Sequence, residues 1–400
     1  MNDRLIEIAN LASKCQCGNN HNSIPIEEIV IEKGALEQSI NFLQKKGFQH
    51  AVLVVDEHTF KAAGEKLSNL LKKAAIHHTV CLVDPDENGD VAADEKVIVQ
   101  ALLGMPREAD VLLAVGAGTL QDVTRFCSEK TEKPFISIPT APSVDGFTSM
   151  GAPLIIRGFK KTFQTQAPIA VFADIDVLVS APPEMVAAGF GDMIAKFTSL
   201  ADWKFGALMA DEPYCELVES MTKEALEKCI VNKDNIARRN ETGITALIEA
   251  LIVSGLAMLV FGQSHPASGG EHHLSHYWEM EFLRERRPQV LHGAKVGVST
   301  PLLAQLYKEE MQAILLDPSQ VKDAFMRKRI KDNQQEIKAI LNKIPESAYF
   351  EKLIEKTGGE SSTTELGIHD SLVTDSMLEA HKLRDRFTML RFLNEELEYN

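Results

Sequence analysis

The chain has 400 residues, too many for one ordinary hydrophobic core, so its length indicates two domains or one large domain with insertions. An apolar share of 44% and a charged share of 25% are typical of a soluble globular enzyme and exclude a collagen-like, disordered or disulfide-rich chain. The net charge of −15 disfavours nucleic acid and anionic membrane surfaces as partners. An anionic substrate would need a local positive feature, such as a metal ion, a helix N-terminus or a few Lys and Arg side chains.

The cysteine content is low, with six in the chain, so no disulfide framework is expected. Cys15 and Cys17 form a Cys-x-Cys pair close to His21. A metal site there is possible, but the sequence shows no second pair of ligands to complete it, so free thiols are favoured. We therefore expect free thiols in a reducing cytoplasm, and the first residues show no apolar run typical of a signal peptide.

The first half alternates short apolar runs with helical patterns. Strands are predicted at 50–56, 79–84, 110–115, 134–138 and within 169–179, and helices at 59–74 and 94–103. Apolar strands separated by helices indicate a parallel sheet covered on both faces. The fold class is therefore α/β, with an N-terminal Rossmann-like parallel-sheet domain.

After Pro182 the periodicity becomes helical. Helices are predicted at 184–209, 213–230, 244–261, 268–284, 289–311, 318–341 and 371–397. We expect a dinucleotide-binding domain at 1–182 and an all-helical metal- and substrate-binding domain at 183–400. The apolar segment 243–262 has the length of a membrane span, but Glu249 lies within it, so a buried helix is favoured.

Two loops after strands are candidates for nucleotide binding. Gly116-Ala-Gly118 follows the third predicted strand and opens a helix, where backbone N–H groups can approach a pyrophosphate. The full Gly-x-Gly-x-x-Gly pattern is absent because Gln121 stands at the third glycine position, so an ordinary turn stays equally open. Asp56, at the end of the first predicted strand, could bind ribose hydroxyls. The second loop, 139–149, carries hydroxyl groups and one Asp but is by itself only a loop.

Histidines give the strongest signal, because five of the 12 lie between His265 and His292. Ser268 and Glu271 form a capping-box pattern, which predicts a helix that begins just after Ser268. His272 and His276 are then one helical turn apart on one face. Any single histidine could be a satisfied core or surface residue, but the cluster favours metal or catalytic use.

Asp192 is the candidate third ligand. It ends the run Gly189-Phe-Gly-Asp192, which we interpret as a glycine-punctuated helix start, and it could equally be an N-terminal helix charge. Sequence spacing cannot bring Asp192 to the histidines. Two histidines and a carboxylate with an open position would form a catalytic rather than a structural metal site.

Several motifs together resemble one superfamily. Runs at 116–122, 139–145, 191–192, 270–276 and 292–296 resemble the metal-dependent polyol dehydrogenases, which include glycerol dehydrogenase, dehydroquinate synthase and the iron-type alcohol dehydrogenases. Within that superfamily, Ser143-Val-Asp145 and the run 266–272 look most like the sn-glycerol-1-phosphate dehydrogenase branch. The likeness covers roughly residues 25–310.

The resemblance implies a Rossmann-like domain followed by a helical domain, with the active site in the cleft between them. It implies metal ligands Asp192, His272 and His292, and substrate contacts from Asp145, Asp192 and His276. With His276, the three ligands form the expected catalytic set. The implied cofactor contacts are Asp56, Gly118, Thr119, Leu120, Gln121, Asp122, Thr140, Ala141, Pro142, Ser143 and Ser149.

The implied activity is NADH- or NADPH-dependent reduction of dihydroxyacetone phosphate to sn-glycerol 1-phosphate, with one divalent ion, Zn²⁺ or Ni²⁺, and iron also compatible with such ligands. Asp56 would repel a 2′-phosphate, so NADH should serve at least as well as NADPH. The implied assembly is a homo-oligomer, with a homodimer favoured.

Some alternatives stay open. Lys160 and Lys161 could hold the substrate phosphate, although a solvated lysine pair is the simpler interpretation. The activity could instead be that of a glycerol or other polyol dehydrogenase or a dehydroquinate-synthase-like lyase. A non-catalytic nucleotide- or metal-binding protein is a more distant alternative.

Overall fold

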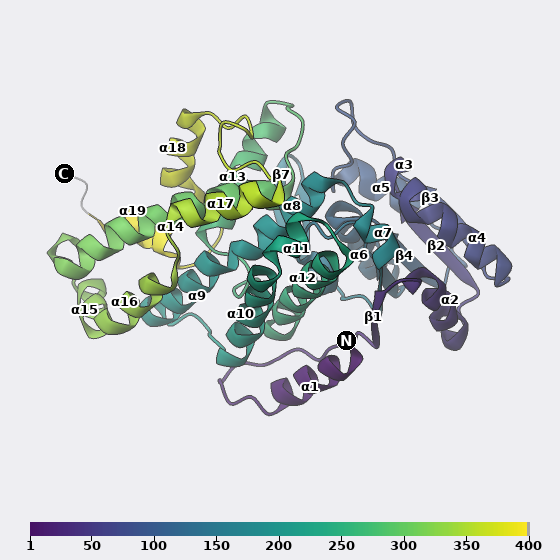
Figure 1. Ribbon diagram of the computed structural model, residues 1–400, viewed down its shortest axis with the longest axis horizontal. Helices are drawn as coiled ribbons and strands as arrows, with labels where there is room; N and C mark the ends of the chain where they lie inside the picture. Colours follow the sequence, from purple (N-terminus) through teal and green to yellow (C-terminus); the bar gives the residue numbers. More distant parts are fainter. Residues whose placement is uncertain (398–400) are drawn as a thin grey trace.

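The N-terminal half is built on a six-stranded parallel sheet. The computed structural model describes residues 1–397 (Figure 1). The strands of the sheet lie in the order β1-β8-β5-β4-β2-β3. Strands β6 and β7 form a separate antiparallel pair. The strand bounds are β1 Glu28–Glu32, β2 His50–Val55, β3 His77–Leu82, β4 Val111–Val115, β5 Phe135–Ile138, β6 Gly151–Ile156, β7 Phe159–Gln164 and β8 Ala170–Asp174.

Helices cover the sheet and form all of the regular structure after β8, apart from one isolated bridge within the described residues. The α-helices are α1 Asn2–Ser13, α2 Ala35–Lys46, α3 Glu57–Thr59, α4 Glu65–Lys73, α5 Glu95–Leu103, α6 Gly118–Thr131, α7 Ile175–Val179, α8 Pro183–Ile194, α9 Lys196–Ala210, α10 Glu216–Val231, α11 Lys233–Ala237, α12 Glu241–Phe261, α13 Gly270–Arg284, α14 His292–Leu316, α15 Ala324–Asp332, α16 Gln334–Lys343, α17 Ser347–Thr357, α18 Asp370–Glu379 and α19 Met389–Glu396. Short non-α turns are η1 Phe60–Gly64, η2 Gly146–Thr148, η3 Pro318–Gln320 and η4 Ala380–Leu383.

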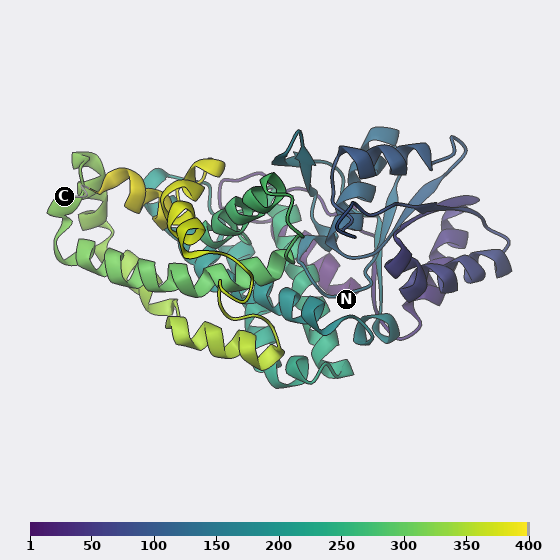
Figure 2. The same cartoon turned by 90° about the horizontal axis from the view of Figure 1, so that it is seen from above.

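The sheet is buried on both faces, as its apolar strands predict. All five residues of β4 are buried, and separate hydrophobic clusters lie on the two faces of the sheet. Figure 2 shows the sheet at one end of the molecule and the helical part at the other. The predicted fold class, a parallel-sheet domain followed by a helical part, is confirmed. The domain boundary near Pro182 stays a prediction.

Two features of the N-terminal half have no counterpart in the sequence interpretation. Strand β1 pairs with β8 at the edge of the sheet, and its sequence EIVIE has too short an apolar run to stand out. The β6–β7 hairpin turns at Arg157 and Gly158, both with positive φ. Most of β7 is exposed or half-buried, so it carries no continuous apolar signal.

Long predicted helices are interrupted in the C-terminal half. The segment predicted at 184–209 divides at Ala195 into α8 and α9. The segment at 318–341 divides into α15 and α16, and that at 371–397 into α18, η4 and α19. Helix α10 begins at Glu216, so Pro213 precedes it instead of occupying its first turn. Periodicity continues across these breaks because both pieces face the same core.

Helix α12 is the apolar segment of membrane-span length. In the most apolar 18-residue stretch of α12, 83% is buried inside the protein, so the predicted buried helix is confirmed. Glu249 pairs with Lys228 on α10 at the rim of this core.

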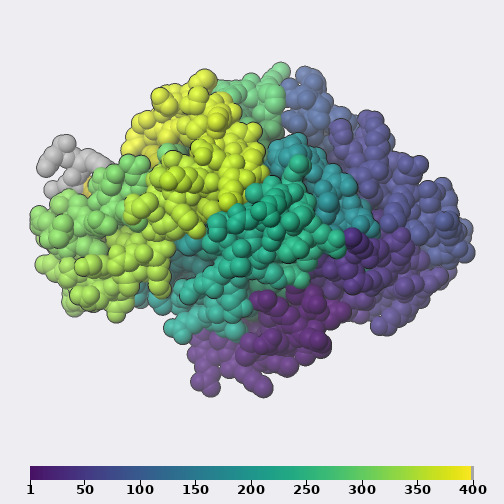
Figure 3. Space-filling view, viewed as in Figure 1, coloured from purple at the N-terminus to yellow at the C-terminus, as the bar shows by residue number. Residues whose placement is uncertain are grey.

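The N-terminal segment packs on the helical half. Leu5, Ile8 and Ala12 of α1 are buried in the same hydrophobic cluster as α10 and α12. Figure 3 shows these first residues, in purple, against the teal residues of the helical half.

Candidate active site

A cavity of about 1120 Å³ lies between the carboxyl edge of the sheet and the helical half. Nearly all the predicted cofactor contacts line it, from Asp56 through the turn after β4 to Ser149. Asp145, His272, His276 and His292 line it as well. Pro142 does not: its carbonyl packs against Gly189 of α8. The structure therefore brings the two predicted sites, nucleotide loop and histidine cluster, to one cavity.

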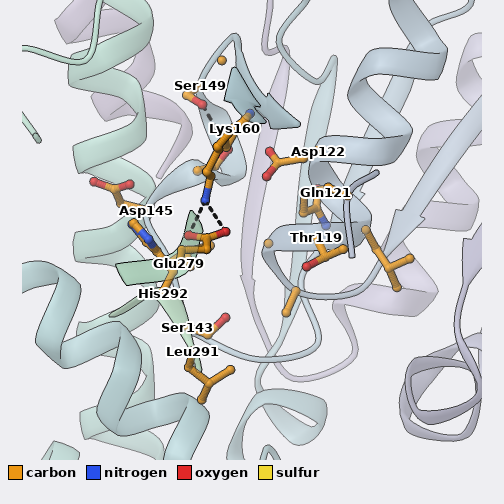
Figure 4. A pocket seen from close by; sticks show the side chains of 18 of the residues that line it. Thr119, Gln121, Asp122, Ser143, Asp145, Ser149, Lys160, Glu279, Leu291 and His292 are labelled. Carbon is orange, nitrogen blue, oxygen red and sulfur yellow. Dashed lines mark hydrogen bonds and ion pairs between the residues drawn. The ribbon is translucent and has the colours of Figure 1, made fainter. Parts of the chain in front are cut away.

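The turn from β4 into α6 is tight at Gly116. A Cβ there would come within 2.4 Å of Cδ1 of Leu120, so no larger residue fits. Gln121, at the position of the missing third glycine, turns its amide back and donates to the carbonyls of Ala114 and Gly116 at 2.8 and 3.1 Å. The Gln121 side chain thus stabilises the turn. The part of this segment that can bind a ligand is the N-terminus of α6. Figure 4 shows Thr119, Gln121 and Asp122 on one side of the cavity and Asp145 and His292 on the other.

Two carboxylates face the nucleotide part of the cavity. Asp56 caps α3: its Oδ1 accepts a hydrogen bond from the backbone N–H of Thr59 at 2.7 Å. Its Oδ2 does not take part in this capping hydrogen bond. Asp122 pairs with the fully buried Arg125 at 2.9 Å. Burial raises the pKa of Asp122 to about 7, although the Arg125 charge opposes the rise. Asp122 therefore lies close to the balance between its neutral and charged forms at neutral pH.

The three predicted metal ligands converge. One ligand atom each from Asp192, His272 and His292 lie within 4.8 Å of one another. Nε2 of His272 is 3.7 Å from Oδ1 of Asp192, and the ring centroids of His272 and His292 are 5.2 Å apart. Asp192 is fully buried and is not among the residues that line the cavity, unlike His272 and His292.

Glycines let the helices that carry these ligands meet. A Cβ on Gly293 of α14 would come within 1.9 Å of the carbonyl oxygen of Ala188, and one on Gly191 would be 2.4 Å from the carbonyl of Gly293. The two backbones are thus in contact, which places Asp192 beside His292. The interpretation of Gly189–Asp192 as a helix start is wrong: it lies in the C-terminal half of α8, where its glycines serve close packing.

The start of α13 orients His272. Glu271 Oε1 lies 2.8 Å from Nδ1 of His272 and accepts from the N–H of Gly269. Because Nδ1 is engaged, Nε2 faces Asp192 and is free to bind a cation. Helix α13 begins at Gly270, one residue later than predicted, and the Ser268 side chain does not cap it.

Lys196 neutralises the buried carboxylates. Its Nζ lies 2.8 Å from Oδ1 of Asp192 and 2.8 Å from Oδ2 of Asp145, one helical turn after Asp192. Although burial opposes ionisation, Lys196 and the nearby histidines hold the pKa of Asp192 below its ordinary value. Burial and the Asp192 charge raise the pKa of Asp145. Although burial also acts against charge on His272, Asp192 and Glu271 raise its pKa. Asp192 is therefore held as a carboxylate, the form that can bind a cation.

His276 is held differently from His272. Its Nε2 is 3.0 Å from Nη2 of Arg384, which can only donate, so Nε2 accepts and Nδ1 carries the proton of the neutral ring. Burial, with Lys160 and Arg384 nearby, keeps the pKa of His276 well below its ordinary value. Nδ1 has no hydrogen-bond partner among residues 1–397, and Oε2 of Glu279 is 3.8 Å away. His276 thus carries a free N–H donor beside the cluster.

Two lysine side chains pair with Glu279. Lys160 Nζ lies 2.8 Å from both carboxylate oxygens of Glu279 (Figure 4). Lys295 Nζ is 3.2 Å from Oε2 of the same residue. Arg384 reaches the same part of the cavity through His276. The interpretation of Lys160 as a solvated lysine is wrong, since only 12% of its side chain is exposed, whereas Lys161 is exposed. Three positive side chains and one carboxylate make this part of the cavity locally positive, although Asp56, Asp122 and Asp145 line its other parts.

Five of these residues were not predicted as site residues from the sequence: Lys196, Glu271, Glu279, Lys295 and Arg384. Lys196 follows Asp192 by four residues, so helical spacing could have indicated it. Arg384 comes from a C-terminal segment without a motif.

The comparisons with known proteins agree with this geometry. Residues 30–182 match the family described as iron-containing alcohol dehydrogenase. The glycerol-1-phosphate dehydrogenase (NAD(P)+) of Geobacillus stearothermophilus is 53% identical and covers 99% of this chain and 99% of its own length. The protein of the same name from Methanosarcina mazei is 32% identical over 91% of this chain and 90% of its own length.

Solved structures share the fold. Glycerol dehydrogenase from Schizosaccharomyces pombe superposes with a TM-score of 0.63 at 16% identity, covering 96% of this chain and 86% of that one. NADH-dependent butanol dehydrogenase A from Thermotoga maritima gives a TM-score of 0.66 at 13% identity, covering 93% of this chain and 94% of that one.

Proposed function

We propose that this chain, which belongs to the glycerol-1-phosphate dehydrogenase family, reduces dihydroxyacetone phosphate to sn-glycerol 1-phosphate with NADH or NADPH in a reversible reaction. The family relationship makes it an oxidoreductase that uses NAD(P). The observation that carries the proposal is one cavity lined by both the turn after β4 and the histidines of the Asp192 cluster.

The residues present fit a divalent ion. Asp192 offers a carboxylate and His272 a correctly oriented Nε2, while Nδ1 of His292 has no partner among residues 1–397. Such nitrogen and oxygen donors suit Zn²⁺ or Ni²⁺. When bound, the ion would polarise the C2 carbonyl of the substrate while NAD(P)H supplies the hydride.

The chain's own residues would bind and orient the substrate. Lys160, Lys295 and Arg384 line the cavity and would provide the positive charge that a phosphate dianion needs. Asp145, held by Ser254 and Lys196, would accept from the substrate hydroxyl. His276 would donate from Nδ1 as negative charge develops on the C2 oxygen.

Metal removal tests the proposal directly. Chelator-treated protein should lose triose-phosphate reduction, and add-back of Zn²⁺, Ni²⁺, Co²⁺ or Fe²⁺ should restore it with one of these ions. Activity that persists in fully stripped protein would overturn the metal assignment. Protein that binds NAD yet turns over nothing with any ion added would be the non-catalytic alternative.

The phosphate assignment separates this activity from glycerol dehydrogenase. Lys160→Met and Arg384→Met should each raise KM for dihydroxyacetone phosphate by about 10- to 100-fold, the value of one charge-assisted hydrogen bond. KM for dihydroxyacetone should not change. Lys96→Met is the control, because this lysine on α5 is exposed and does not line the cavity. A native enzyme that prefers the unphosphorylated triose would favour a glycerol dehydrogenase. Conversion of a dehydroquinate precursor without net NADH oxidation would favour a lyase.

The oligomeric state and the cellular compartment of the protein are also predictions. We expect a homodimer, which sedimentation or light scattering would detect, in the cytoplasm.

A further inference from the structure

A second cluster of metal-ligand side chains lies outside the cavity. Cys15, Cys17, His21 and Cys215 place their ligand atoms within 4.8 Å of one another. None of the four lines the cavity described above. Cys15, Cys17 and His21 come from the segment between α1 and β1, and Cys215 immediately precedes α10.

The spacing of the ligand atoms is that of a tetrahedral metal site. Sγ of Cys15 is 3.6 Å from Sγ of Cys215, Nε2 of His21 is 3.6 Å from the same sulfur, and Nε2 is 3.3 Å from Sγ of Cys17. Tetrahedral Zn²⁺ with bonds of about 2.3 Å to sulfur and about 2.0 Å to nitrogen sets such atoms about 3.5 to 3.8 Å apart.

The surroundings orient the ligands, as those of metal sites do. Nδ1 of His21 is 3.4 Å from the carbonyl oxygen of Val260, a contact that directs Nε2 and its lone pair to the sulfurs. The Asn19 amide donates to Sγ of Cys17 and to the carbonyl of Tyr214. Cys215 is fully buried and is the residue that precedes the first turn of α10, so its sulfur is held in a fixed position.

We propose that Cys15, Cys17, His21 and Cys215 bind one structural Zn²⁺ per chain, separate from the ion at the candidate active site. Three thiolates and one imidazole are a closed, soft donor set, which selects zinc and leaves no position for substrate. The ion joins the N-terminal segment to the start of α10.

The position of the cluster indicates what it stabilises. Asn22, one residue after His21, donates through its backbone N–H to the carbonyl of Val260 at 2.9 Å and through its amide to that of Leu259 at 3.0 Å. The chain after this end of α12 runs through Gly262 to Ser268 and lines the cavity. The zinc site thus anchors the N-terminal segment against the back of one cavity wall.

Metal analysis of the full-length protein, purified under reducing conditions and saturated with zinc, tests the proposal. We expect two zinc ions per chain in the wild-type protein. His272→Ala should lose one ion and retain the other, and Cys17→Ser should also lose one ion. Cys17 is half-buried, so its replacement by serine leaves the core intact. Cys81→Ser, at a buried cysteine of β3, is the matched control and should keep both ions.

Cobalt gives a readout specific to sulfur. The Co²⁺-loaded protein should show a thiolate-to-metal charge-transfer band, which Cys17→Ser and Cys215→Ser weaken or abolish and His272→Ala leaves in place. If Cys215→Ser does not fold, a mercurial titration of the wild-type protein replaces it, and zinc release should follow blocking of the thiols.

The absence of the band, zinc content unaffected by Cys17→Ser, or a Cys15–Cys215 disulfide in freshly purified zinc-supplied protein would each overturn the proposal. The total zinc count includes the active-site ion, but the cobalt band and the zinc lost from Cys17→Ser do not depend on that ion, so the two assignments fail independently.

Discussion

Oε1 of Glu271 lies 2.8 Å from Nδ1 of His272, and both residues belong to the first turn of α13. This contact fixes which ring nitrogen of His272 faces Asp192. Carboxylates placed behind a histidine ligand also strengthen its bond to the metal.

Glu271→Gln is therefore expected to weaken binding of the active-site metal by about 10- to 100-fold, because the amide orients the ring but lacks the charge. Competition with a chelating dye measures this affinity. Glu285→Gln, at an exposed position beyond the end of the same helix, should bind the metal as the wild type does. Unchanged affinity in Glu271→Gln would show that the contact does not serve the site.

His272 and His276 are expected to differ in what they hold. His276→Ala should lower kcat by about 100-fold or more, the value of a positioned proton donor, and keep its metal. His272→Ala should lose the metal and the activity together. Metal content and activity measured on the same preparations separate the two roles; equal metal loss in both variants would show that His276 is a ligand.

Asp56 is expected to set the cofactor preference. Asp56→Ser keeps a side chain that can cap α3 but removes the charge that would repel a 2′-phosphate. The ratio of kcat/KM for NADPH to that for NADH should rise by about 10-fold, the effect of removing one nearby charge. Asp94→Ser makes the same change at the cap of α5, outside the cavity, and should leave the ratio alone. If the ratio does not move in Asp56→Ser either, the ribose is bound elsewhere.

Asp122 is expected to make stability depend on pH. Burial raises its pKa to about 7, against an ordinary value of about 4, so between these values the folded protein holds a proton that the unfolded chain releases. Its contribution to the free energy of unfolding is full below about pH 4 and is lost as pH rises to about 7. Denaturant unfolding across this range should show a smaller decline in Asp122→Asn than in the wild type. Glu129→Gln, an exposed carboxylate on the same helix, should decline as the wild type does.

The sequence by itself determined much of this protein. Continuous apolar strands such as β4 can only be buried on both faces, which fixed the parallel sheet, and the four-residue interval between His272 and His276 placed both on one face of α13. Short or exposed strands such as β1 and β7 were not predicted, because their sequences have little apolar periodicity.

Only the tertiary structure decided which distant residues meet. The glycines of α8 and α14 let two helix backbones come into contact, which brings Asp192 to His292. Cys215 completes a cluster with Cys15, which lies 200 positions earlier in the chain. Spacing along a chain predicts contacts within one helix or turn. Contacts between elements depend on how their surfaces pack, and local periodicity does not record that.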